Sequence, residues 1–177
     1  MKLINLRINT KKQPYNIVIG SNLLPNISKI FKNNSVNFKK CLLVVDKNIS
    51  NKIILKFKNS FVKKEIYTHL FLASEKNKNQ KNVNKILEIM LKKNFTRDDC
   101  LISIGGGITG DVGGFAASLF KRGLKFINVP TTLLSQVDSS IGGKTGVNTI
   151  YGKNLIGSFY QPNLVVSDIQ FLKTLPK

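Results

Sequence analysis

Leu101–Gly123, LISIGGGITGDVGGFAASLFKRG, is the stretch that decides the expected fold. Its first residues are apolar or small and contain no breaker, which predicts a short strand. Glycines follow, and glycine lets a ligand approach the backbone closely. After Gly110, apolar residues recur at helical spacing, with Asp111 expected as a capping or first-turn acid. Strand, glycine turn and helix together predict a phosphate-binding turn, because a helix start offers free amides and a favourable dipole.

The glycine turn also matches a dinucleotide-binding spacing, G-x-G-x-x-G, at Gly105, Gly107 and Gly110. This match alone is weak, because consecutive glycines satisfy many patterns. The usual fingerprint adds an acid roughly 20 residues later, but no acid lies between Asp111 and Asp138. We therefore expect a phosphate-binding turn that is not the first turn of an ordinary dinucleotide fold. A tight strand–helix turn without a ligand is the alternative.

The composition is that of a single globular domain. The 177 residues are 42% hydrophobic, which is enough for one core. No apolar run reaches the length of about 18 residues expected of a membrane span. The N-terminus alternates apolar and polar residues instead of forming the apolar core of a signal peptide, so we expect a cytoplasmic protein. Cys41 and Cys100 begin apolar runs, where a small buried thiol is expected.

The net charge of +19 raises the question of nucleic-acid binding. The excess is almost all lysine, because Arg7, Arg97 and Arg122 are the only arginines. The lysines are scattered and accompany abundant asparagine, which indicates a compositional bias of the whole chain. We expect no nucleic-acid partner and no membrane partner, although a basic field would attract an anionic small substrate.

Short apolar strands alternate with amphipathic helices after a strand-rich start. The expected strands cover residues 2–8, 15–19, 41–45, 65–71, 101–104, 126–129 and 164–166. This order predicts an α/β fold with a doubly wound, mostly parallel sheet and a ligand edge at the carboxyl ends of its strands. His69, the only histidine, lies within an expected strand, where a structural role is more common than a ligand role.

Polar residues follow two of the expected strands directly. Asp46 and Asn48 are placed to hold ribose hydroxyls, or alternatively to cap a helix that begins near Ile49. Thr131 and Thr132 close a later strand and lie near the same edge, although Thr131 is equally placed as an N-cap.

Two glycine-containing segments carry lysines near the end of the chain. A glycine pair precedes Lys144, and Gly152 precedes Lys153. The first segment contains Gly-Lys-Thr but is no P-loop, because Asp138 replaces the first glycine of that motif. We expect two glycine loops that hold both ammonium groups near Asp138 and Asn154 as an anion-binding pocket. A solvated loop is the alternative.

The motifs GGGITGDVGGF, KRG, VPTTLLSQVDSSIGGKTGVN, GKNLIGSFYQP and FLKTLP occur in this order. Together they resemble the 3-dehydroquinate synthase family, densely over residues 100–176 and more thinly over 41–93. The resemblance implies a Rossmann-like NAD-binding domain and a homodimer. It also implies conversion of 3-deoxy-D-arabino-heptulosonate 7-phosphate to 3-dehydroquinate and phosphate in the shikimate pathway. In that reaction NAD is a transient oxidant, and a zinc or cobalt ion polarises the substrate hydroxyl that is oxidised. Other sugar-phosphate cyclases and glycerol-dehydrogenase-like enzymes share the fold.

The resemblance also implies a set of functional residues. Substrate and catalysis would involve Asp138, Lys144, Lys153 and Asn154, and Arg122 would reach the substrate phosphate of a neighbouring subunit. NAD would contact Asp46, Asn48, Glu75, Lys78, Gly107, Gly110, Asp111, Thr131, Thr132, Lys144, Lys153, Phe171, Leu172, Lys173 and Thr174.

The sequence departs from the family pattern at several places, including Thr109, where an aliphatic residue is usual, and Gly146, where an alanine is common. The segment before Glu75 lacks the usual proline and glycine. The family's metal ligands, a glutamate and two histidines, follow the LxTLP motif in a helical second domain, and Glu65, Glu75, Glu88 and His69 cannot replace them. We therefore expect an NAD-binding α/β domain over residues 1–177, truncated before the metal-binding domain and inactive alone. A non-catalytic NAD-binding remnant and a subunit of a split enzyme are the alternatives.

Overall fold

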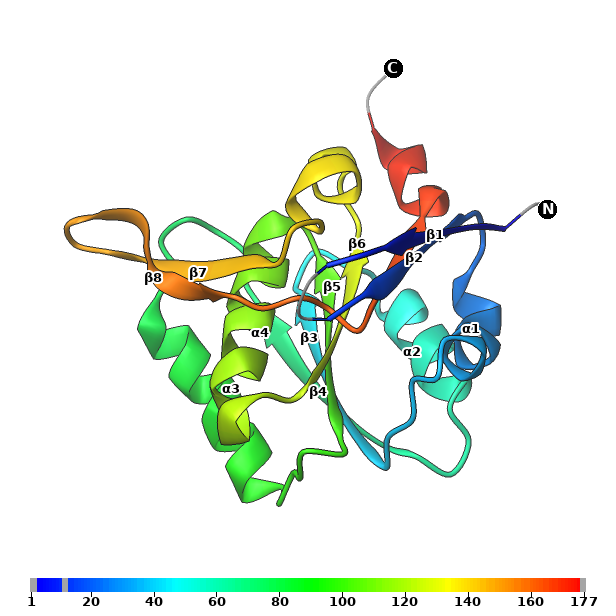
Figure 1. The fold of residues 1–177 in the computed structure, drawn as a ribbon, viewed down its shortest axis with the longest axis horizontal. Helices are drawn as coiled ribbons and strands as arrows, with labels where there is room; N and C mark the ends of the chain where they lie inside the picture. Colours follow the sequence, from blue (N-terminus) through cyan, green and yellow to red (C-terminus); the bar gives the residue numbers. More distant parts are fainter. Residues whose placement is uncertain (1–2, 11–12, 176–177) are drawn as a thin grey trace.

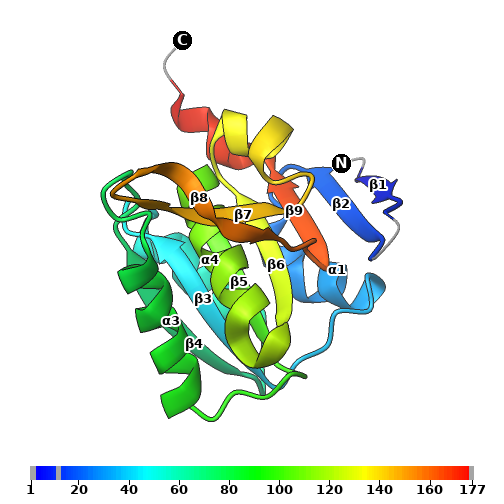
Figure 2. The same ribbon diagram turned by 60° about the vertical axis from the view of Figure 1, so that its left-hand side comes forward.

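A seven-stranded sheet with helices on both faces forms the body of the computed structural model, which describes residues 3–10 and 13–175 (Figures 1 and 2). Its strand order is β1-β2-β9-β6-β5-β3-β4, and every neighbouring pair except β1–β2 is parallel. The doubly wound, mostly parallel sheet predicted from the sequence is confirmed. The strands are β1 Ile4–Ile8, β2 Tyr15–Gly20, β3 Lys40–Asp46, β4 Glu65–Phe71, β5 Cys100–Gly105, β6 Lys125–Pro130, β7 Lys144–Thr149, β8 Gly152–Phe159 and β9 Leu164–Asp168. The helices are η1 Leu24–Asn26, α1 Ile27–Asn33, α2 Asn51–Asn59, α3 Gln80–Lys92, α4 Gly107–Leu119, η2 Phe120–Arg122, η3 Ser135–Ser139 and η4 Ile169–Thr174.

The central strands β3 and β5 are buried on both faces, as their continuous apolar sequences predict. Cys41 and Cys100 lie in register on these two strands and are fully buried, so the predicted buried thiols are confirmed. Burial raises the pKa of the Cys41 thiol well above its ordinary value, and the adjacent Cys100 adds to the shift. These thiols therefore belong to the core.

Two layers of helices cover the sheet. Helices α1 and α2 pack on one face, where Phe31, Phe57 and Phe61 contact one another and the side chains of β3. Helices α3 and α4 cover the other face through Val83, Ile86 and other apolar residues (Figure 1). The amphipathic spacing of α2 and α3 decides which side of each helix turns toward the sheet, whereas α4 is buried over most of its length.

The order of the strands reverses between β3 and β5. The chain passes from β3 outward to β4 on one side, and from β5 outward to β6 on the other. Such a switch point leaves a crevice outside the carboxyl ends of the two central strands, which is where open α/β sheets bind ligands.

Helix α4 begins at Gly107, whereas its apolar spacing indicates a helix only after Gly110. Its N-cap residue is Gly106, which has no side chain that could cap the helix. Asp111 lies in the second turn, so the prediction that it caps the helix or belongs to the first turn is wrong. Because glycine has a low helix propensity, the sequence of residues 107–110 does not predict a helix, and the expected start of α4 is too late.

Strands β7 and β8 form an antiparallel hairpin beside the main sheet, where the sequence predicted two glycine loops around the lysines. That prediction is wrong about local structure, because Lys144 begins β7 and Lys153 lies within β8. The preceding Gly142 and Gly143 do adopt left-handed φ values, 87° and 69°. In Figure 2 the hairpin lies across α4.

The segment after β6 carries an apolar face that is turned outward. Leu134 is 68% exposed and Val137 is 63% exposed. Thr132 caps this turn, since its hydroxyl oxygen accepts from the backbone N–H of Ser135 at 3.2 Å. The alternative role of Thr131 as the cap is therefore wrong. Within residues 3–10 and 13–175, none of the helices has the length and apolar character of a membrane span.

Candidate functional site

The glycine bend after β5 lies at the switch point of the sheet. A Cβ built on Gly105 would lie 3.1 Å from the Cβ of Asp46, and one built on Gly106 would lie 3.2 Å from Cγ2 of Thr132. Asp46 and Thr132 therefore flank the bend from the ends of β3 and β6. The backbone N–H of Thr131 donates to the Gly105 carbonyl at 2.9 Å and fixes this arrangement.

The first turn of α4 presents backbone amides at the bend. Because the N-cap is glycine and no side chain caps the helix, these amides are available to an anion. The helix start is also tightly packed. A Cβ on Gly107 would lie 2.8 Å from Oγ of Ser139, and one on Gly110 would lie 3.1 Å from Nδ2 of Asn128. Glycine at both positions keeps this turn close to its neighbours.

Asp46 does not cap helix α2, so that alternative is wrong. The N-cap of α2 is Ser50, and Asp46 Oδ1 accepts the backbone N–H of Asn48 at 3.0 Å. A carboxylate can accept several hydrogen bonds, so Asp46 retains capacity for a hydroxyl ligand at the sheet edge.

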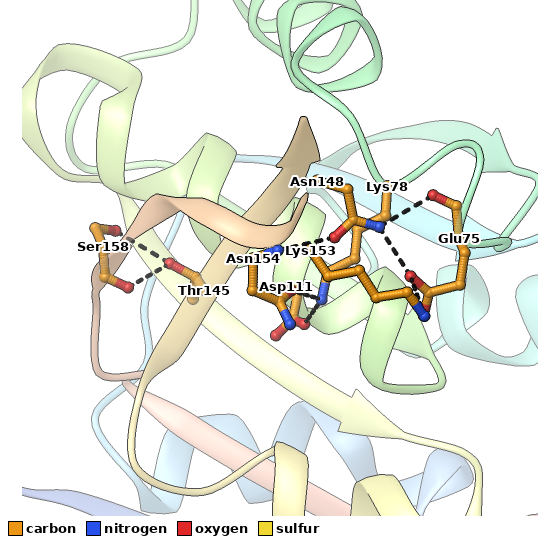
Figure 3. Close-up of polar contacts among 8 residues, drawn as sticks. All are labelled: Glu75, Lys78, Asp111, Thr145, Asn148, Lys153, Asn154 and Ser158. Atoms are coloured by element: carbon orange, nitrogen blue, oxygen red, sulfur yellow. Dashed lines mark hydrogen bonds and ion pairs between the residues drawn. The ribbon is translucent and has the colours of Figure 1, made fainter. Parts of the chain in front are cut away.

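Lys78 is a buried cation beside the start of α4. Its residue is only 6% exposed, and its Nζ lies 2.5 Å from Oδ2 of Asp111 and donates to Oδ1 of Asn154 at 2.5 Å (Figure 3). Burial raises the pKa of Asp111, and the Lys78 ammonium partly opposes that shift. These contacts join α4 to strand β8 through one ammonium group.

Glu75 lies at the outer end of the same cluster. Its Oε2 accepts from Nδ2 of Asn148 at 2.8 Å and lies 3.7 Å from Nζ of Lys153. The hydrogen bond from Asn148 lowers the pKa of Glu75, and Lys153 and Lys78 lower it further. Glu75 therefore favours its charged form, in contrast to Asp111.

A cavity of about 480 Å³ lies between the start of α4, the turn after η3 and the hairpin. Asp111, Asp138, Lys144 and Asn154 are the predicted site residues that line it. Ser139 also lines the cavity, and its buried hydroxyl has no hydrogen-bond partner among the described residues. The cavity therefore combines a cation, two carboxylates and uncharged polar groups, a set suited to a polar small molecule.

The predicted site residues do not all meet at this cavity. Lys153 is outside its lining and pairs with Glu75 instead. Arg122 follows the C-terminal end of α4, at the end of that helix opposite the glycine bend, with a left-handed φ of 65°. Phe171 packs against the core beside α2, in the short helix after β9 that also holds Leu172, Lys173 and Thr174.

Asn148 is a central member of the cluster that sequence reasoning did not single out. It lies in β7 and contacts Glu75, which is 73 residues earlier in the chain. No local spacing signals such a contact, although Asn148 does fall within a motif quoted above. Ser139 is a second lining residue of the cavity that was not among the predicted site residues.

A metal centre does not emerge from the described part of the chain. Across residues 3–10 and 13–175, no three His, Cys, Asp or Glu side chains gather where an ion could be held. His69 lies in β4, where burial and the nearby Lys85 lower its pKa.

Sequence comparison finds a consistent group of relatives. The family model described as 3-dehydroquinate synthase N-terminal matches residues 68–177. A 3-dehydroquinate synthase of Pelagibacter ubique is 65% identical over 100% of this chain and 48% of its own length. That of Alkaliphilus metalliredigens is 48% identical over 97% of this chain and 47% of its own. The chain thus spans about half the length of these curated relatives.

Solved structures with the same fold include two cyclases. A 2-deoxy-scyllo-inosose synthase complexed with carbaglucose-6-phosphate, NAD⁺ and Co²⁺ aligns with a TM-score of 0.89 at 28% identity, over 98% of this chain and 47% of that one. The 2-epi-5-epi-valiolone synthase of Streptomyces hygroscopicus, with NAD⁺ and Zn²⁺ bound, aligns with a TM-score of 0.79 at 28% identity, over 96% of this chain and 47% of that one.

Proposed function

We propose, because the chain belongs to the 3-dehydroquinate synthase family, that these residues form the NAD-binding part of such an enzyme. The reaction proposed for the whole enzyme converts 3-deoxy-D-arabino-heptulosonate 7-phosphate to 3-dehydroquinate and phosphate, on the route to aromatic amino acids. The observation that carries the proposal is the glycine bend at the switch point, flanked by Asp46 and Thr132. Relatives with this name reach 65% identity, whereas the two cyclase structures are 28% identical, which favours this substrate over those of other cyclases.

The residues at the sheet edge fit NAD. The uncapped start of α4 offers amides to a pyrophosphate, and Asp46 offers a carboxylate to ribose hydroxyls. Thr131 and Thr132 extend the same edge. Further proposed contacts are Asn48, Glu75, Lys78, Gly107, Gly110, Asp111, Lys144, Lys153, Phe171, Leu172, Lys173 and Thr174. When bound, NAD would supply a hydride acceptor that returns the hydride later in the cycle.

The cavity beside this edge fits an anionic sugar acid. The Lys144 ammonium would pair with a carboxylate or phosphate, and the Asn154 side chain would bond to hydroxyls. Asp138 lies in the same lining and would accept from a substrate hydroxyl, orienting it. Lys153 would join this substrate-facing group, and Arg122 is proposed to bind the phosphate held by a second subunit of a homodimer. A guanidinium suits that phosphate because its planar fork binds two oxygens at once.

A divalent cation is also proposed for the whole enzyme, since the cyclase structures contain Co²⁺ or Zn²⁺. The described residues of this chain do not fit such an ion, because no suitable cluster of ligands occurs among them. The steps proposed for Lys144, Asn154 and Asp138 are binding and orientation, and none of them depends on the metal.

NAD binding tests the proposal directly. Calorimetric titration of the 177-residue chain with NAD should show saturable binding, and Asp46→Ala should weaken it by about tenfold, or ~1.4 kcal/mol. Asp98→Ala is the matched control, because Asp98 is an exposed carboxylate in a loop away from the bend. A folded chain that gives no binding heat with NAD would contradict the proposal, as would equal affinities for wild type and Asp46→Ala.

A turnover assay tests the second expectation, that the 177 residues do not complete the reaction alone. The purified chain is supplied with 3-deoxy-D-arabino-heptulosonate 7-phosphate, NAD and zinc or cobalt, and released phosphate is measured. We expect NAD binding without phosphate release. Release at the rate of a full-length relative would overturn this expectation and leave the proposed reaction standing.

A further inference from the structure

Asn148 is half-buried, and its polar contacts join three segments: residues 75–79, strand β7 and strand β8 (Figure 3). Its side-chain Nδ2 donates to Oε2 of Glu75 at 2.8 Å and to the Glu75 carbonyl at 3.2 Å. Its Oδ1 accepts the backbone N–H of Asn154 at 3.0 Å. Its own backbone N–H donates to the carbonyl of Lys78 at 2.8 Å. One residue thus connects the segment around 75–79 with both strands of the hairpin.

The hairpin ladder is interrupted at Asn148. The register between β7 and β8 shifts between Val147 and Thr149, so Asn148 lacks a regular partner on β8. It pairs instead with Asn79 through an isolated parallel bridge. This irregularity turns the end of β7 toward the segment that carries Glu75 and Lys78.

The contact with Asn148 also supports an unusual backbone conformation at Asn154. Asn154 has a left-handed φ of 56°, which asparagine adopts more readily than most non-glycine residues and to which local hydrogen bonds give further support. The bond from its N–H to Asn148 supplies that support, and its side-chain Oδ1 then meets the Lys78 ammonium. Asn148 therefore acts on Lys78 and Asp111 through Asn154, without touching their side chains in this network.

The carboxamide of Asn148 supplies both the donor and the acceptor that this position uses. The Glu75 carboxylate requires a donor, and the Asn154 amide requires an acceptor. An aspartate would keep the acceptor but would place a second carboxylate against Glu75. An alanine would remove both groups.

We propose that Asn148 is a positioning residue that fixes the proposed NAD-binding pair, Glu75 and Lys78, relative to the substrate-facing Asn154. This inference rests on the proposed function for the identity of the ligand. It follows that NAD affinity depends on the contacts through which Asn148 joins the β7–β8 hairpin to residues 75–79. Asn148 itself belongs to neither the proposed NAD ligands nor the proposed substrate ligands.

Two variants of the 177-residue chain test this role through NAD affinity. At about pH 7.5, Asn148→Ala and Asn148→Asp should each bind NAD about tenfold more weakly, ~1.4 kcal/mol. Asn84→Ala, on the exposed face of α3, should bind like wild type. Because Asn148 lies at the hairpin edge and not in the core, both variants are expected to fold.

The aspartate variant adds a readout that general loss of structure would not give. The groups that face position 148 and its partners are Glu75, Lys153, Lys78 and Asp111. In Asn148→Asp, the introduced carboxyl and Glu75 face each other, and protonation of either one restores a donor between them. This variant should therefore recover NAD affinity toward about pH 5, where acid pairs begin to protonate. Wild type at both pH values gives the baseline. An equal deficit at both pH values would overturn the assigned donor role.

Amide hydrogen exchange separates failure of this inference from failure of the proposed function. Without any ligand, the backbone N–H of Asn154, which loses its acceptor, should exchange at least tenfold faster in Asn148→Ala than in wild type, while core amides of β5 are unchanged. If wild type binds no NAD but this acceleration is seen, the proposed function fails and the positioning role stands. Unchanged exchange together with unchanged affinity would show that Asn148 positions nothing.

Discussion

Lys78 and Asp111 form the most demanding electrostatic pair in the described chain. Both side chains are largely removed from water, and their ion pair is supported by Asn154. Removing two charges from water is costly, so such a pair adds less stability than its short distance suggests. Breaking it by removing one partner is much worse, because the other charge stays buried.

Replacing Lys78 by methionine should therefore destabilise the protein strongly. Asp111 would lose its cation while its side chain stays only 20% exposed, and we expect the free energy of unfolding to fall by about 3 kcal/mol. Urea unfolding monitored by circular dichroism measures this change. Lys153→Met is the control, because the Lys153–Glu75 pair is solvent-exposed with 3.7 Å between the charges, and we expect no measurable change. A similar loss in both variants would contradict the distinction between the two pairs.

The pKa of Asp111 predicts a pH dependence with a definite sign. Burial raises this pKa above the ordinary value of 3.8, so folding favours the protonated carboxyl. The linked stabilisation is complete below about pH 3.8 and is lost as the pH rises through the raised pKa of the folded state. The always-neutral variant Asp111→Asn leaves Lys78 buried without its partner and should be less stable than wild type, but this deficit should shrink as the pH rises across that window and stay constant above it. Urea unfolding of both proteins at closely spaced pH values measures this, and a difference that does not change with pH would refute it.

Helix α4 is the element that connects the sheet with the hairpin, and adjacent glycines allow this. A Cβ on Gly113 would overlap Oγ of Ser103 on β5, and one on Gly114 would lie 2.5 Å from Cγ2 of Thr145 on β7. The helix therefore lies close to both elements, and the glycine bend at its start is held at the sheet edge.

Gly113→Ala should destabilise the protein by about 3 kcal/mol, the upper end of the usual range for overpacking. Ser103→Ala in the same chain should recover part of this loss, because it removes the hydroxyl that the new methyl group meets. The Ser103 hydroxyl donates to the Thr109 carbonyl, so the single variant Ser103→Ala completes the double-mutant cycle. Additive effects of the two changes would mean that the helix moves away instead of clashing.

The strands of the sheet could be predicted from the sequence because their signals are local. Cys41–Val45 is apolar without interruption, and only a strand buried on both faces suits such a run. The hairpin could not be predicted, because Lys144 and Lys153 each follow glycine and neither strand shows a clean alternation of buried and exposed residues. The contacts of Asn148 depend on tertiary packing, so the residues of the site were more predictable than their pairings.

At the scale of the whole molecule, the apolar residues after β6 form an exposed surface at the carboxyl edge of the sheet. Leu134 and Val137 belong to it, and exposed apolar area of this kind binds hydrophobic probes.

Leu134→Ser should therefore change stability by no more than about 0.5 kcal/mol, because the side chain makes few buried contacts. The same change should lower the fluorescence of an added hydrophobic dye at equal protein concentration. Leu101→Ser, at a fully buried position of β5, is the contrasting variant and should unfold the domain or weaken it severely. Dye binding that is unaffected by Leu134→Ser would place the probe elsewhere.

The pairing of β2 with β9 brings together residues near the two ends of the described chain. Ile17 is aligned with Val165, and the carboxylate of Asp168 accepts the backbone N–H groups of Asn22 and Leu23. During ribosomal synthesis, the β1–β2 hairpin therefore emerges early, but the edge of β2 that pairs with β9 stays without its partner until almost all of these residues have been made. Such distant closure slows folding, and until β9 is in place the unpaired edge of β2 is open to pairing with other chains.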